Sequence, residues 1–140
     1  MSEEQAQQLL YQMQMLESYA TSLDQKEEAI MTFLREAISS VESVRGINQN
    51  LEFESLVPVG LGTYVKANIS GASKVLLDVG AGIVVEKEPD SAVNYLESRI
   101  KELQVALNET ASQKHEVLTR LEQLKQEMNR LIQSANPPKQ

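Results

Sequence analysis

The sequence predicts an α+β protein in which a long antiparallel coiled-coil hairpin carries two central β-hairpins. Two stretches with a seven-residue apolar repeat predict the helices, and four short runs rich in β-branched residues predict the strands. Two short loops with glycine pairs predict the hairpin connections. The expected organisation is a first helix over residues 1–46, a strand region over residues 47–88, and a second helix with a short tail over residues 89–140.

The first helix is predicted from an apolar repeat whose steps alternate between four and three residues. Its positions hold Leu9, Met13, Leu16, Ala20, Leu23, Glu27, Ile30, Leu34, Ala37, Val41 and Val44. A repeat held this long indicates a supercoiled helix pair and argues against a globular core. We expect the helix to begin near Ser2 and to end near Arg45, with Gly46 in the C′ position.

The middle of the chain is predicted to form four strands. They cover residues 56–59, 63–69, 74–79 and 83–87, and the turns are Gly60-Leu61-Gly62, residues 70–73 and Gly80-Ala81-Gly82. Pro58 cannot donate a ladder hydrogen bond, which indicates an edge strand. Two hairpins cannot cover both of their faces, and the helix seams are expected to face each other. We therefore expect the strands to pair with those of other subunits through Val57, Val59, Val65, Ile69, Val75, Leu77, Val79, Ile83 and Val85.

The second helix repeats the pattern of the first. Its seam positions hold Val93, Leu96, Ile100, Leu103, Leu107, Thr110, Lys114, Val117, Leu121, Leu124, Met128 and Leu131. We expect this helix to begin after Glu88-Pro89, with Asp90 or Ser91 as its cap. It should end near Ser134, because Pro137-Pro138 cannot continue it.

Composition excludes several classes of function. The net charge is −7, and the first helix region holds eight acidic and three basic residues, which argues against nucleic acid and anionic membrane surfaces as partners. The chain has no Cys and a single His, His115, so we expect no metal site. No nucleophile–base pair is discernible, and the glycine pairs complete no phosphate-binding motif, so we expect neither an enzyme nor a cofactor. Without a signal peptide or a membrane span, the expected location is the cytoplasm.

The free ends of the two helices carry more apolar residues than a two-stranded seam requires. Leu10, Tyr11, Met15, Tyr19 and Ile132 lie outside the seam. Methionine side chains are flexible and suit surfaces that bind many shapes. We expect a promiscuous apolar grip, exposed when the helix ends splay apart, at Leu9, Leu10, Tyr11, Met13, Met15, Met128, Leu131 and Ile132. The alternative is that these residues only widen the local helix packing.

Three seam positions are polar: Glu27, Thr110 and Lys114. When Val44 is set against Val93, antiparallel pairing places Glu27 opposite Thr110 and next to the layer of Lys114. Such a cluster lowers stability and fixes the register of the helices. The alternative is that the charged side chains extend to water along the helix surface.

The order helix, two hairpins, helix resembles the prefoldin family, and specifically its α class. The likeness is carried by Leu56-Val57-Pro58-Val59-Gly60 with Tyr64-Val65, and by residues 75–82 with Val84-Val85-Glu86-Lys87. It implies a hexamer of two α-class and four β-class subunits, joined by an inter-subunit β-barrel from which the coiled coils project. It also implies an ATP-independent holdase that binds unfolded polypeptides and delivers them to a group II chaperonin.

The leading functional hypothesis is therefore a chaperone subunit that binds non-native chains at its coiled-coil tips. The second hypothesis is a structural, tethering or filament-forming coiled-coil subunit without client binding. Chemistry at the helix ends separates the two, because a tether should carry charged ends and this chain carries apolar ones.

Overall fold

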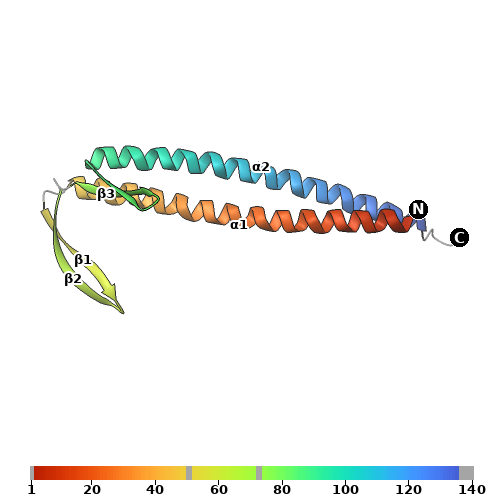
Figure 1. The fold of residues 1–140 in the computed structure, drawn as a ribbon, viewed down its shortest axis with the longest axis horizontal. Coiled ribbons are helices and arrows are strands. Elements are labelled where there is room, and N and C mark those ends of the chain that lie inside the picture. The colour runs from red at the N-terminus through yellow and green to blue at the C-terminus, as the bar shows by residue number, and fades with distance from the viewer. Residues whose placement is uncertain (1, 50–51, 72–73, 136–140) are drawn as a thin grey trace. The chain divides into compact units, whose positions relative to one another are not determined.

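The computed structural model describes residues 2–49, 52–71 and 74–135. Its elements follow the predicted order of helix, two β-hairpins and helix, so the predicted fold is confirmed (Figure 1). They are α1 (Ser2–Gln49), β1 (Glu52–Gly60), β2 (Thr63–Ser70), β3 (Val75–Gly80), β4 (Ile83–Lys87) and α2 (Pro89–Ala135).

The chain divides into two compact units. We call Met1–Thr32 with Gln104–Gln140 the helical unit and Phe33–Leu103 the hairpin unit. Each unit contains part of α1 and part of α2. Every predicted seam position of both heptad stretches is buried or half-buried, so the seam is confirmed in each unit.

The helical unit is held together by apolar side chains from α1 and α2, which run antiparallel within it (Figure 1). Its core contains Ala20, Leu23, Val117 and Leu121, with Met13 and Leu16 packed beside them. Leu124 is fully buried. At roughly 1.5–3 kcal/mol for each large side chain removed from water, this seam dominates the stability of the helix pair.

The hairpin unit contains two separate antiparallel sheets, β1 with β2 and β3 with β4. Both hairpins close through a two-residue loop in which each residue has a positive φ: Leu61 and Gly62 in one, Ala81 and Gly82 in the other. That geometry is a type I′ turn, whose twist matches the flanking strands. The register shifts between Pro58 and Gly60 and again between Asp78 and Gly80, so the two hairpins share the same irregularity.

One hairpin packs against the helices of its own unit. Leu77 is buried in a cluster with Val41, Val44, Ala92 and Val93, and Val75 packs against the same cluster. The expectation that the helices offer the strands no partner is therefore wrong for β3. The helix residues at this point are short, which leaves room for the Leu77 side chain to reach the seam.

The helix ends differ from the expectation. Helix α1 passes through Gly46 and continues to Gln49, so the predicted C′ role of Gly46 is wrong. Half-buried Ile47 prolongs the apolar stripe, and Arg45 Nη2 lies 2.6 Å from Glu97 Oε1 on α2. These contacts favour the helical conformation at Gly46, which a glycine inside a helix disfavours by roughly 1 kcal/mol.

Helix α2 begins at Pro89, and the backbone N–H of Ala92 donates to the carbonyl of Glu88 at 2.9 Å. Glu88 therefore takes the N-cap position, and the prediction of Asp90 or Ser91 as cap is wrong. Proline suits the first helical position because it has no N–H to leave unpaired.

The strand bounds also move slightly. Strand β1 begins at Glu52 instead of residue 56, because Phe53 and Ser55 alternate as half-buried positions on one face. The predicted turn over residues 70–73 lies partly outside the described residues, as does Pro137-Pro138.

Candidate functional site

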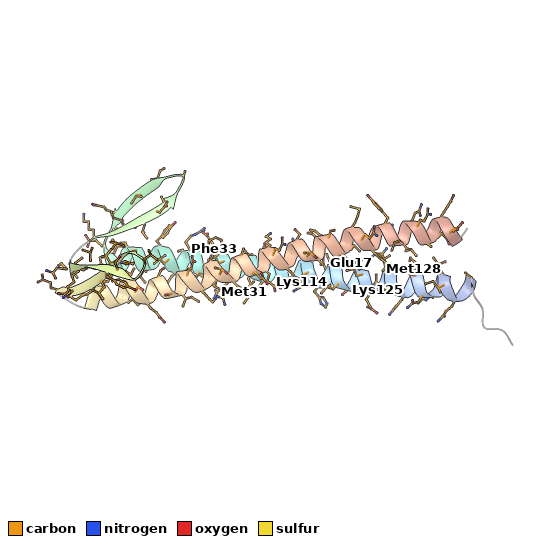
Figure 2. The ribbon with its side chains drawn as sticks, turned by 90° about the horizontal axis from the view of Figure 1, so that it is seen from below. Glu17, Met31, Phe33, Lys114, Lys125 and Met128 are labelled. Atoms are coloured by element: carbon orange, nitrogen blue, oxygen red, sulfur yellow. The ribbon has the colours of Figure 1, made fainter. Side chains whose placement is uncertain are left out.

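The residues predicted to form an apolar grip fall into two groups in the helical unit. Four belong to the seam and are half-buried between the helices: Leu9, Met13, Met128 and Leu131. The other four project into solvent: Leu10, Tyr11, Met15 and Ile132. Figure 2 shows Met128 near the end of α2, on the stretch that runs beside α1. The first group closes the helix pair, and the second is available to a partner.

Three exposed side chains form one ridge along α1. Tyr11, Met15 and Tyr19 are spaced four residues apart, which places them on the same side of a helix. Their exposed fractions are 63%, 57% and 47%. We call these three residues the α1 ridge. Large adaptable side chains that stay exposed on the described surface are typical of a binding site for varied apolar ligands.

A groove opens between the two helices near their ends. It has a volume of about 350 Å³ and is lined by Gln5, Gln8, Leu9, Gln12, Glu127, Arg130, Leu131 and Ser134. We call it the end groove. A smaller hollow of about 170 Å³ lies beside Met128, Leu131 and Ile132. The helix pair is therefore incompletely closed at this end.

A charged cluster crosses the helical unit. Lys114 Nζ on α2 lies 2.5 Å from Asp24 Oδ1 and 3.6 Å from Glu27 Oε1 on α1. Figure 2 labels Lys114 on its helix. The hydrogen bond to Asp24 is the main cause that raises the pKa of Lys114 above its ordinary value, and the charge of Glu27 adds to it. The predicted proximity of Glu27 and Lys114 is thus present.

Thr110 does not join this cluster. It is buried, and its Oγ1 donates to the carbonyl of Ala106 on its own helix at 2.8 Å. The predicted three-residue cluster is wrong in this member, because a threonine hydroxyl can satisfy itself within one helical turn. The partner of Lys114 beside Glu27 is Asp24. It follows the seam residue Leu23 directly, and flanking positions of this kind often form interhelical ion pairs.

The residues predicted to join subunits also differ in exposure. Leu77 is buried, while Ile69, Val75 and Val85 are half-buried within this chain. The exposed members are Val57, Val59, Val65, Val79 and Ile83. Sequence reasoning missed four further exposed apolar strand residues: Leu56, Tyr64, Leu76 and Val84. Neighbours such as Leu56 and Val57 point to opposite faces, so both faces of the strands expose apolar surface.

A second groove lies within the hairpin unit. Its volume is about 590 Å³, and it is bordered by α1, the end of β3 and α2. Phe33, Val79, Tyr95 and Leu103 are among the side chains that line it. Apolar side chains on the strand faces and beside this groove are therefore left uncovered in the hairpin unit, which is typical of a surface that binds a partner.

The described residues form neither a metal-binding cluster nor a helix that could cross a membrane. Across residues 2–49, 52–71 and 74–135, no group of three or more His, Cys, Asp or Glu side chains is placed to hold a metal ion. Neither α1 nor α2, over their described lengths, is apolar enough to span a bilayer.

The architecture of two paired helices bearing two hairpins is that of known coiled-coil chaperone subunits. The family model for prefoldin subunits matches residues 3–134 of this chain. The prefoldin subunit alpha of Nitrosopumilus maritimus is 49% identical over 143 residues, covering 99% of both chains. The prefoldin subunit alpha of Methanosarcina barkeri is 33% identical over 129 residues, covering 92% of this chain and 83% of that protein.

Solved structures share the fold. The prefoldin beta subunit from Thermococcus strain KS-1 superposes with a TM-score of 0.65 at 21% identity, covering 96% of this chain and 95% of that one. A filamentous prefoldin from Methanocaldococcus jannaschii gives a TM-score of 0.55 at 24% identity, covering 89% of this chain and 98% of that chain. The chain therefore belongs to the prefoldin family of chaperone subunits, and to its α class.

Proposed function

We propose that this chain is a subunit of an ATP-independent holdase that binds non-native polypeptides at the ends of its helices. The observation that carries the proposal is the α1 ridge, which exposes two tyrosines and a methionine on one side of α1. An unfolded chain presents apolar side chains in no fixed arrangement, so its receptor must adapt. Methionine and tyrosine provide adaptable apolar area at a modest entropic cost.

Several weak contacts can hold such a client. Each large side chain contributes roughly 1.5–3 kcal/mol when fully buried, and a ridge residue buries only part of its area against a mobile partner. Several subunits in one assembly would bind the same client at once and raise the overall affinity. In this proposal the chain assembles with β-class subunits as two α and four β, and the hexamer passes clients to a group II chaperonin.

The exposed apolar strand faces support assembly through the hairpins. Val57 and Val65 are cross-strand partners in the β1–β2 register, and both are exposed. Strands from neighbouring subunits would cover them and extend both sheets, which completes an inter-subunit β-barrel.

A triple substitution tests client binding. Tyr11→Ser, Met15→Ser and Tyr19→Ser together should abolish the ability of the assembled protein to suppress aggregation of a denatured enzyme, measured by light scattering without nucleotide. The matched control replaces three exposed apolar residues elsewhere in the helical unit by serine: Met31, Val105 and Leu118. Full protection by the ridge variant would contradict the proposal.

The alternative is a structural or filament-forming subunit without client binding, and one solved structure that shares this fold is described as filamentous. This alternative predicts that neither triple variant changes aggregation and that the purified chain forms long polymers visible by electron microscopy.

A further inference from the structure

The turn of the first hairpin carries an apolar side chain that suits neither the turn nor water. Leu61 is the first residue of the two-residue loop between β1 and β2, and its φ is 47°. Type I′ turns favour asparagine, aspartate or glycine at this position, because a positive φ crowds a bulky side chain. Leu61 is also more exposed than any other large apolar side chain of the described residues. Its backbone conformation and its exposure both disfavour leucine in the free chain.

The second hairpin provides an internal comparison. It has the same type of turn and the same register shift before the turn, and Ala81, with a φ of 54°, occupies the position of Leu61. Alanine exposes only a methyl group there. The first hairpin, in contrast, also exposes Val59 and Tyr64 beside its loop. We call Val59, Leu61 and Tyr64 the hairpin tip. An apolar group of this kind is typical of a surface that a partner covers.

The groove bordered by α1, the end of β3 and α2 has matching chemistry, and we call it the β3 groove. Its volume of about 590 Å³ can hold several side chains. Phe33 and Val79 line it and stay exposed, while Tyr95 and Leu103 line it and are half-buried. Because Leu61 is fully exposed, the hairpin tip does not occupy the groove of its own chain.

The charges of the two surfaces are complementary. Glu36 and Asp78 line the β3 groove, and Arg99, which also lines it, is already paired with Glu102, with Nη1 and Oε2 2.6 Å apart. The strand that leaves the hairpin tip, β2, carries the exposed cation Lys66. An acidic groove can therefore face a cationic strand. A single exposed pair of this kind contributes little by itself, so the apolar contact must supply most of the affinity.

We propose that the hairpin tip docks into the β3 groove of a second copy of this chain, with Leu61 as its apolar anchor. The contact removes Leu61 and Phe33 from water together. Each copy carries one tip and one groove, so two copies exchange tips and close the contact as a symmetric pair. The inference does not depend on client binding. It also concerns a different surface from Val57 and Val65, through which strands of other subunits are proposed to pair.

Substitution of Leu61 separates the turn from the contact. Leu61→Asn suits a positive φ, so the full-length chain should unfold at the same or a higher temperature. The same variant should raise the dissociation constant of the pair by about tenfold or more in sedimentation equilibrium, because a large apolar side chain is no longer buried. Ala81→Asn makes the equivalent change in the second hairpin and should leave this constant unchanged. An unchanged constant for Leu61→Asn, or a native chain that stays monomeric, would overturn the proposal.

The groove is tested from its own side. Phe33→Ala should weaken the pair by a similar factor, and its combination with Leu61→Asn should weaken the pair little further, because both substitutions remove the same contact. Ile38→Ala, at an exposed position of α1 that does not line the groove, is the matched control. Additive effects of Leu61→Asn and Phe33→Ala would mean that the anchor binds elsewhere, which contradicts docking in the β3 groove.

The absence of Cys from the chain allows a direct check of the contact. Chains with Thr63→Cys, next to the loop, and chains with Glu36→Cys, in the groove, are purified apart and mixed. A short bis-maleimide should join them into a product that contains one chain of each kind. Glu42→Cys, exposed on α1 outside the groove, should give far less of this product in place of Glu36→Cys. Equal yields from the two positions would contradict the proposed contact.

Discussion

Lys114 on α2 and Asp24 on α1 form the shortest ion pair across the helical unit, with Nζ and Oδ1 2.5 Å apart. Glu27 lies on the same side at 3.6 Å from Nζ, so one cation serves two carboxylates. A lysine in a seam position normally disfavours close packing. We therefore expect the pair to favour this register of α1 against α2, because a shift by one heptad would separate the charges.

Replacing Asp24 should disturb the helical unit more than replacing Glu27. Asp24→Asn removes the closest partner of Lys114, while Glu27→Gln removes the more distant one, so the first should lower the melting temperature further. Glu28→Gln, at an exposed position of the same helix, serves as the control. The effects of Asp24→Asn and Lys114→Met should not add, since each breaks the same contact. Additive shifts in calorimetry would contradict a pair that acts as a unit.

The same pair predicts a loss of stability in alkali. The folded pKa of Lys114 is raised above 10.5, so its charged form favours the folded state. This contribution is complete below the unfolded pKa and disappears as the pH rises through the higher folded value. Between pH 9 and pH 12, the melting temperature should therefore fall less steeply for Lys114→Met than for the native chain. If the melting temperatures of the two proteins changed in parallel with pH, the protonation of Lys114 would not be linked to folding.

Adjacent leucines of β3 should respond differently to truncation. Leu77 is buried against both helices of the hairpin unit, while Leu76 is exposed on the other face of the strand. Leu77→Ala should destabilise the unit by about 2–5 kcal/mol, and Leu76→Ala should stay within about 0.5 kcal/mol in the isolated chain. Urea unfolding measures both. Equal losses would mean that β3 packs through both of its faces.

Assembly should depend on the exposed face of the first hairpin. Val57→Asp with Val65→Asp places two adjacent charges where a partner strand is proposed to bind, and a buried charge without a partner is costly. The variant should keep its helix content and fail to enter the complex when it is co-expressed with a β-class subunit, as measured by native mass spectrometry. Lys66→Gln, on the opposite face of β2, provides the control. A complex of unchanged mass would show that this face is not an interface.

The heptad seam and the two hairpin turns could be predicted from the sequence alone. A seven-residue repeat is a local property of a helix, so each stretch specified its buried side without knowledge of the other. The predicted turns Gly60-Leu61-Gly62 and Gly80-Ala81-Gly82 contain the observed two-residue loops, because glycine accommodates a positive φ that few other residues tolerate.

Other features were decided by contacts between distant segments. A glycine shortly after the last seam residue is a common end of a helix. In this chain α1 continues past Gly46 to Gln49, where Ile47 is half-buried and Arg45 pairs with Glu97. The strand pattern predicted Leu77 as an inter-subunit interface residue. Its packing against Val41 and Val93, which the sequence does not reveal, places it in the core of the hairpin unit.

The candidate site shows the same division. The apolar residues at the helix ends were visible in the sequence, but which of them close the seam and which stay exposed depends on how α1 and α2 pair. Likewise, the glutamines at 5, 8 and 12 carry no signal until α2 provides the opposite wall of the groove. Periodicity specifies the side of a helix, whereas the partner of each side chain is set by the register between helices, which only the tertiary structure defines.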